Sequence, residues 1–180
     1  LDNSKNGVSA KICEVLGLEN TKILIPKKGI IKQLNTYVPN EKAEELRTVL
    51  LEININTIGN YDNCSCSNLG EGTFQGNENA NPSYGKKGEL HTEKETKISI
   101  VFESKDEKAI INVLKENHPY EEVAYEIIST ENVHENIGMG MIGEFKAAMD
   151  ESEFLNYLKK TMKTDCVRHS ALLNKSIKKV

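Results

Sequence analysis

Hydrophobic positions along this chain follow two periods, which predict where helices and strands lie. Apolar residues spaced three or four positions apart predict helices over residues 8–18, 43–53, 106–117 and 151–162. Alternating or β-branched apolar runs predict strands over residues 21–25, 30–38, 57–61, 96–103, 123–129, 141–145 and 177–180. Residues 62–94 are rich in Gly, Asn, Ser, Pro and charged residues, which predicts a long loop between two of these strands.

The order of these elements predicts an α+β fold with an insert. From residue 37 to residue 130 the order is strand, helix, strand, long loop, strand, helix, strand, which is the split βαβ order of ferredoxin-like modules. We therefore expect a ferredoxin-like insert domain over residues 31–132. Residues 1–30 and 133–180 would be two parts of an outer domain that the insert interrupts. The chain starts at Leu1 without Met and stops at Val180 within an apolar run, so we expect both ends to be cut.

Charge and composition exclude several classes of protein. The 180 residues include 23 Lys plus Arg against 27 Asp plus Glu, a formal net charge of −4. Only Arg47 and Arg168 offer the planar group favoured in phosphate and base recognition, so nucleic acid is not expected as a partner. No long apolar run and no signal-peptide pattern occurs, which predicts no membrane partner and a cytoplasmic location. Four cysteines are too few for a secreted disulfide framework, so we expect reduced thiols.

Two glycine-rich segments raise the question of nucleotide or anion binding. Residues 138–143 match the G-x-G-x-x-G dinucleotide fingerprint, which must follow a strand and open a helix. Here a polar run precedes the glycines and a strand-like run follows, so we favour a glycine-rich turn that enters a strand. Residues 70–76 could cradle an anion through backbone amides, but they lack the Lys of a P-loop and no helix follows. We favour a mobile surface loop there.

The cysteine pair and the isolated histidines offer little chemistry of their own. Cys64 and Cys66 provide two thiolates, whereas a closed zinc site needs four ligands, so isolated strand cysteines are the favoured interpretation. His91, His134 and His169 each stand alone in polar surroundings, and we interpret them as surface residues.

The densest cluster of ligand-type groups is the His-Pro-Tyr-Glu-Glu run at residues 118–122, directly after a predicted helix. An imidazole and two carboxylates are the groups that bind a divalent cation or transfer protons. In the structural alternative, Pro119 ends the helix, Tyr120 packs and the two acids are solvated. On the chemical interpretation, His118, Glu121 and Glu122 face a cleft or a subunit junction.

Several motifs occur in an order that is specific to one family. They are Leu1-Asp2, Gly7-Val8, Leu16-Gly17-Leu18, Gly59-Asn60-Tyr61, Gly70-Glu71-Gly72-Thr73-Phe74, Ala80-Asn81-Pro82, His118-Pro119-Tyr120-Glu121-Glu122 and Gly138–Gly143. Together they resemble the central part of the Nif-three-like dinuclear metal centre proteins, also called GTP cyclohydrolase 1 type 2 homologues. The resemblance covers nearly the whole chain.

The resemblance implies a two-metal site on an outer α/β domain and an insert similar to the CutA and PII type of module. Family members hold two divalent ions per full-length chain, with zinc, iron or manganese as candidates here. Only Asp2 maps onto a metal ligand; the others would lie outside this chain. The resemblance also implies a homo-oligomer, a trimer or hexamer. The candidate residues at the cleft are His118, Glu121, Glu122, Asn60, Tyr61 and Asn81.

Two functions follow from the sequence and the resemblance. The first is a fragment of a dinuclear-metal-binding protein whose hydrolase-type activity is left open, with the chain alone expected to be inactive. The alternative is a non-enzymatic, trimeric regulatory or oligomerisation module that binds an unidentified small molecule or cation.

Overall fold

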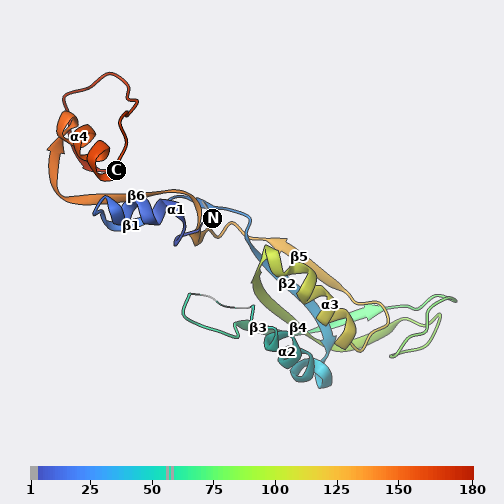
Figure 1. Ribbon diagram of the computed structural model, residues 1–180. Coiled ribbons are helices and arrows are strands. Elements are labelled where there is room, and N and C mark those ends of the chain that lie inside the picture. The colour runs from blue at the N-terminus through green and yellow to red at the C-terminus, as the bar shows by residue number, and fades with distance from the viewer. Residues whose placement is uncertain (1–3, 56, 58) are drawn as a thin grey trace. The chain divides into compact units, whose positions relative to one another are not determined.

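The chain forms two compact units in a computed structural model that describes residues 4–55, 57 and 59–180 (Figure 1). The central unit is Lys28–Asn132, and the flanking unit combines Leu1–Lys27 with Val133–Val180. Each unit contains helices and an antiparallel sheet, which confirms the predicted α+β class.

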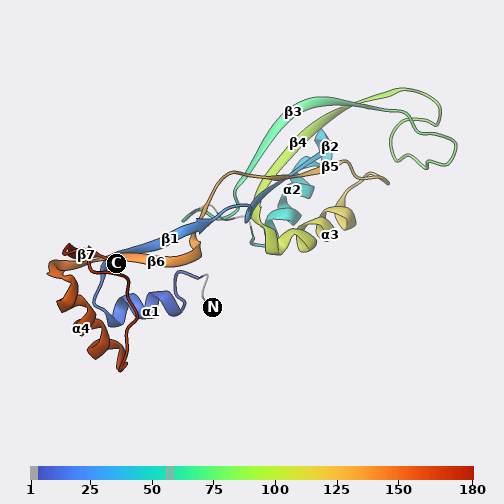
Figure 2. The same cartoon turned by 90° about the horizontal axis from the view of Figure 1, so that it is seen from above.

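The central unit is a four-stranded antiparallel sheet with two helices on one of its faces (Figure 2). The strands stand in the order β3-β4-β2-β5, so β2 and β4 are central and β3 and β5 are edges. Each helix follows a short 3₁₀ turn, Asn40–Lys42 before α2 and Ser104–Asp106 before α3. The elements are β2 (Ile31–Pro39), α2 (Ala43–Glu52), β3 (Ser65–Phe74), β4 (His91–Glu103), α3 (Glu107–Asn117) and β5 (Tyr125–Ser129).

The core of the central unit lies between the helices and the two central strands. Alternate residues of a strand point to one face, and the register places Leu34 opposite Ile100 on β4. The fully or nearly fully buried core residues are Leu34, Val38, Leu46, Leu50, Ile98, Ile100, Phe102, Ile110 and Leu114. The opposite face of the sheet carries polar groups, among them Asn35, whose Oδ1 accepts a hydrogen bond of 2.8 Å from Ser99 Oγ.

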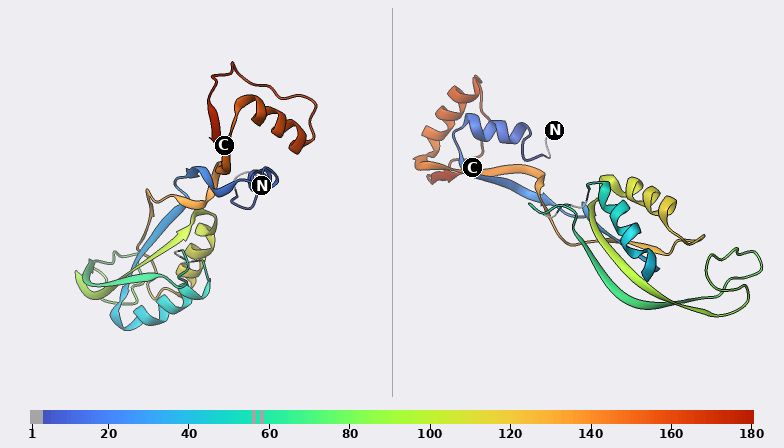
Figure 3. Two further views of the ribbon diagram at one scale, coloured as in Figure 1. Left: turned by 90° about the vertical axis from the view of Figure 1, so that its left-hand side faces the viewer. Right: turned by 90° about the horizontal axis from the view of Figure 1, so that it is seen from below.

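The long loop predicted over residues 62–94 is largely a β-hairpin, so that prediction was wrong. Strands β3 and β4 pair from Ser65 opposite Ile100 to Phe74 opposite His91, which leaves only residues 75–90 as the connecting loop. Residues 57–61 were predicted as the second strand of the unit, but the described residues among them form no strand. The second strand is β3 instead. Figure 3 shows the hairpin extending beyond the rest of the sheet. Its glycines and polar residues fit because most side chains of this edge strand are exposed.

The flanking unit is a three-stranded antiparallel sheet in the order β1-β6-β7, with two helices. Helix α1 ends close to the predicted point, and Gly17 follows it with a φ of +67°, a conformation that favours glycine. Phe145 on β6 is buried against Phe154 and Tyr157 of α4. The elements are α1 (Val8–Val15), β1 (Glu19–Lys27), β6 (His134–Asp150), α4 (Glu151–Met162) and β7 (Ser176–Lys179).

The G-x-G-x-x-G segment lies inside strand β6 and opens no helix, so it does not have the structure of a dinucleotide fingerprint. It is also not the turn that the sequence favours. Gly138 pairs with Pro26 on β1, and a Cβ atom on it would lie 2.2 Å from the carbonyl oxygen of Ile25. A Cβ on Gly143 would lie 2.9 Å from Leu18 Cβ. These two glycines therefore allow β6 to lie close against its neighbours.

The helices of the described residues are too short to span a bilayer, since the longest of them, α4, has 12 residues.

Candidate functional site

The candidate site is a cavity of about 520 Å³ in the central unit, at the end of the long hairpin. It is formed by the end of β3, the hairpin loop, the first part of β4 and the segment between α3 and β5. The lining residues include the aromatic residues Tyr37, Phe74, Tyr84 and Tyr120 and the acidic residues Glu71, Glu95, Glu121 and Glu122. A volume of this size is typical of small-molecule sites.

Glu95 and Tyr120 form the buried polar pair of this cavity. The Tyr120 hydroxyl donates a 2.7 Å hydrogen bond to Glu95 Oε1, and Glu95 has an exposed fraction of only 8%. Burial, together with the neighbouring Glu95 carboxylate, raises the pKa of the Tyr120 phenol far above its usual value, so the phenol remains a donor. The pair therefore holds the Glu95 carboxylate in the wall of the cavity, with one of its two oxygens accepting a hydrogen bond.

Gly72 provides the space for the second oxygen of this carboxylate. A Cβ atom on Gly72 would lie 2.1 Å from Glu95 Oε2, so any side chain there would displace the carboxylate. Among the described residues no hydrogen-bond donor reaches Oε2.

His118 is a structural residue that faces inward. Its Nε2 lies 3.0 Å from the carbonyl oxygen of Tyr37 on β2, and its Nδ1 accepts a 3.1 Å bond from the backbone N–H of Tyr120. Nδ1 must be unprotonated to accept, so Nε2 carries the hydrogen and donates it. Burial lowers the pKa of His118, which favours this neutral form. Because both ring nitrogens are used, the imidazole is not free to bind a ligand.

Glu121 and Glu122, by contrast, line the cavity. Glu121 Oε2 accepts a 2.7 Å hydrogen bond from the backbone N–H of Asn81, which ties the segment after α3 to the hairpin loop. The structure thus brings Asn81 to Glu121. Glu122 is exposed at the cavity wall.

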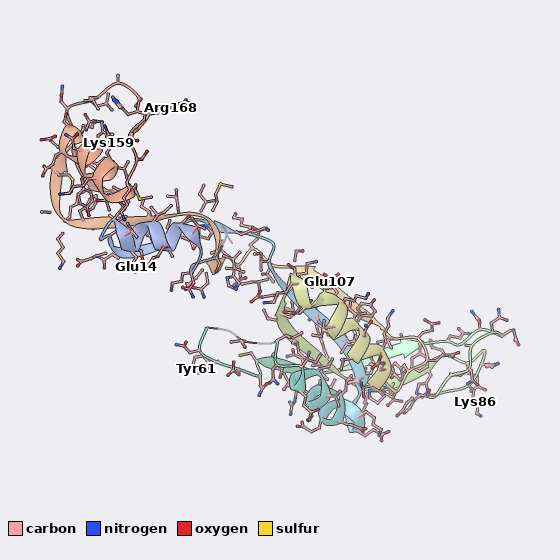
Figure 4. All side chains as sticks on the ribbon, in the orientation of Figure 1. Glu14, Tyr61, Lys86, Glu107, Lys159 and Arg168 are labelled. Atoms are coloured by element: carbon pink, nitrogen blue, oxygen red, sulfur yellow. The ribbon has the colours of Figure 1, made fainter. Side chains whose placement is uncertain are left out.

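The other sequence candidates lie elsewhere. Asn60 and Tyr61 are exposed and do not line the cavity. They precede β3, whereas the cavity lies at the end of that strand; Figure 4 shows Tyr61 and Lys86 at opposite ends of the central unit. Asp2 lies outside the described residues. His91 is not an isolated surface residue, because its ring contacts Phe74 at 5.1 Å and its Nε2 lies 2.9 Å from Glu93 Oε2.

The sequence interpretation missed Glu95, Phe74 and Tyr84 as members of a site. All three lie in, or directly after, the segment interpreted as a loop, so the sequence provided no prediction of the directions in which their side chains point. The alternation of β4 does extend upstream of residue 96, and it places Glu95 on the same face as His91 and Glu93. That alternation was the signal that could have identified Glu95.

The described residues do not provide a metal centre. Within residues 4–55, 57 and 59–180, no three His, Cys, Asp or Glu side chains are grouped so that they could hold a metal ion. Cys64 and Cys66 are free thiols.

We expect the purified 180-residue chain to retain fewer than two ions per chain after incubation with zinc, iron(II) or manganese(II) and gel filtration. A pair of ions needs several ligands, and Asp2 alone cannot replace them. Elemental analysis of the protein peak measures the ratio of metal to chain. Two tightly retained ions per chain would contradict this expectation.

Comparisons with known proteins confirm the resemblance found in the sequence motifs. The model of the Duf34/NIF3 (NGG1p interacting factor 3) family matches residues 1–180. The GTP cyclohydrolase 1 type 2 homolog of Bacillus subtilis is 35% identical over 181 residues, and that of Halalkalibacterium halodurans is 34% identical over 182. Both matches cover 100% of this chain but 48% and 49% of the relatives, so the chain spans about half their length. A Bacillus cereus protein related to NIF3 has a TM-score of 0.73 and 31% identity, covering 99% of this chain and 47% of that one.

Proposed function

This chain belongs to the Duf34/NIF3 family, and from that membership we propose that its central unit is the small-ligand-binding insert of a longer protein. The insert would be a ferredoxin-like module of the CutA and PII type. The strand order β3-β4-β2-β5, with helices after β2 and β4, supports this assignment. The role is regulatory binding rather than catalysis.

The observation that carries this proposal is the cavity of about 520 Å³ formed within the central unit. A concave site with mostly aromatic and aliphatic walls and a few convergent polar groups is the usual form of a small-molecule site. The buried Glu95 and Tyr120 give such a site fixed polar groups, and the Glu121 contact with Asn81 closes the hairpin loop against it.

Metal-dependent hydrolysis is the second candidate, for the longer protein, and the observation that favours it is the name of the relatives. Curated relatives are named as homologues of a GTP cyclohydrolase, which is a hydrolase. The described residues of this chain do not fit a two-metal site, so they supply no step of that reaction. Asp2 and residues of the longer protein would have to hold the two divalent ions.

We further propose that the protein is cytoplasmic and that the central unit associates with copies of itself in a trimer or hexamer. Strand β3 is a long edge strand, and Leu69 on it is 81% exposed. An exposed edge with an apolar side chain is a surface that another strand or chain can cover.

The cavity proposal predicts that a bulky side chain on its wall abolishes ligand binding. We expect Ser83→Trp, which places an indole at the cavity, to remove the thermal stabilisation produced by metabolite-library compounds that stabilise the unaltered chain. The matched control is Asn79→Trp, in the same loop but outside the lining residues. It should bind the same compounds. If no compound binds the unaltered chain, or if both variants bind alike, the proposed function is wrong.

A further inference from the structure

We infer that the cavity of the central unit binds a small organic amine in its ammonium form, with an apolar body against the aromatic wall. This inference rests on the proposed ligand-binding function and adds the chemical class of the ligand.

The first support is the charge of the lining. Four acidic residues, Glu71, Glu95, Glu121 and Glu122, line the cavity, and the described lining residues include no Lys, Arg or His. Glu71 lies opposite Lys94 on β4, on the other face of the sheet from Glu95, so the negative charge at the cavity comes from Glu95, Glu121 and Glu122. Two nearby lysines already have partners: Lys42 Nζ lies 2.9 Å from Glu45 Oε2, and Lys97 Nζ lies 5.8 Å from the ring centroid of Tyr37, which is itself a lining residue. The cavity therefore attracts a cation and repels an anion such as a nucleotide phosphate.

The second support is Glu95, a buried acidic residue with an exposed fraction of only 8%. Its Oε1 accepts the hydrogen bond from Tyr120, whereas among the described residues no donor reaches Oε2. A buried carboxylate is costly unless its charge is paired and its oxygens are hydrogen-bonded. The N–H groups of an ammonium ion supply both the charge and the missing donor.

The third support is the aromatic wall, which favours an organic cation over a bare metal ion. Tyr120 contacts Phe74 and Tyr84 edge to face, with ring centroids 5.7 and 5.6 Å apart, so rings from three chain segments meet at one place. Such a wall binds ammonium groups through the ring quadrupole and packs against an apolar body. Among the described residues, the acidic residues of the lining lack the grouping that a metal ion needs.

The test compares three probes that share one ring and a two-carbon chain: 2-phenylethylamine, 2-phenylethanol and 3-phenylpropanoate. Each is titrated into the 180-residue chain at pH 7 while backbone amide resonances are recorded by NMR. We expect the amine to shift resonances at the end of β3 and in residues 120–124, with a Kd at least about tenfold below that of the alcohol. We expect the carboxylate not to bind.

Variants of the chain test whether Glu95 is the group that pairs with the positive charge of the amine. Glu95→Gln keeps the shape of the side chain and should raise the Kd of the amine about tenfold. Its control, Glu78→Gln, removes one exposed charge from the hairpin loop outside the lining and should leave the Kd unchanged. Tyr84→Leu removes one ring and should raise the Kd about three- to fivefold. If Glu95→Gln loses the amide protection of β4, Glu122→Gln and Tyr84→Leu decide the test, and the inference is wrong unless both variants raise the Kd of the amine.

The possible results separate this inference from the proposed function. If the alcohol or the carboxylate binds as tightly as the amine, the ligand is not an ammonium ion, although the cavity is still a site. If Glu95→Gln folds and binds the amine normally, the inference is wrong. If none of the three probes binds while library compounds do, the inference fails and the proposed function stands.

Discussion

Replacing Gly138 with Ala is expected to destabilise the flanking unit by about 1–3 kcal/mol, the range for inserting a methyl group where there is no space. The added Cβ would lie 2.2 Å from the carbonyl oxygen of Ile25 and 2.4 Å from Ile23 Cγ2. The first of these atoms belongs to the backbone of β1, so the contact cannot be relieved by rotating a side chain. The two strands must separate, and their hydrogen bonds must lengthen.

Native-state hydrogen exchange measures this effect unit by unit. Protection of amides in β1 and β6 should fall in Gly138→Ala, while protection in β2 and β4 stays unchanged because the central unit has its own core. The control is Gly70→Ala on β3, where nothing lies within 4 Å of the added Cβ and no positive φ is required. That variant should change stability by less than about 0.5 kcal/mol. Equal protection in Gly138→Ala and the unaltered chain would contradict the close-packing role.

The parts of the fold that could be predicted from sequence are the helices and strands that bury one side of the element in a hydrophobic core. Strands β2 and β4 and helices α2 and α3 form the core of the central unit, so their apolar residues recur at the expected period. Edge strand β3 buries almost nothing, and its sequence Ser-Cys-Ser-Asn-Leu-Gly-Glu-Gly-Thr-Phe has the composition of a loop. Its pairing with β4 depends on a long-range partner that local composition does not reveal.

Dependence on partners that are distant along the chain also explains which residues of the site could be predicted. The sequence marks the His-Pro-Tyr-Glu-Glu run as a dense cluster, and both of its acids line the cavity. Sequence spacing could not show that the imidazole turns inward toward β2, because that depends on where the carbonyl of Tyr37 lies in the folded unit. It also could not show that Glu95 lies beside Tyr120, since 25 residues separate them along the chain.

Replacing His118 with Ala is expected to lower the unfolding free energy of the central unit by about 2–4 kcal/mol, from lost packing and two lost hydrogen bonds. The ring joins the end of α3 to β2 and fixes the backbone at Tyr120. Without it, the carbonyl of Tyr37 loses this donor, and Tyr120 is less firmly held against Glu95. Amide protection in β2 and α3 should fall, whereas an exposed-histidine control, His169→Ala, should change stability by less than about 0.5 kcal/mol.

The pH dependence of stability distinguishes this structural role from a chemical one. Burial lowers the pKa of His118 in the folded chain, so below the unfolded value of about 6.5 the unfolded chain binds more protons than the folded chain. The contribution of this histidine is therefore complete above that pH and is lost as the pH falls toward the lower folded pKa. His118→Gln, which cannot titrate, should remove this part of the acid destabilisation, whereas His169→Gln should not. If His118→Gln and the unaltered chain lose stability in parallel between pH values of about 6.5 and 5, the buried neutral imidazole is ruled out.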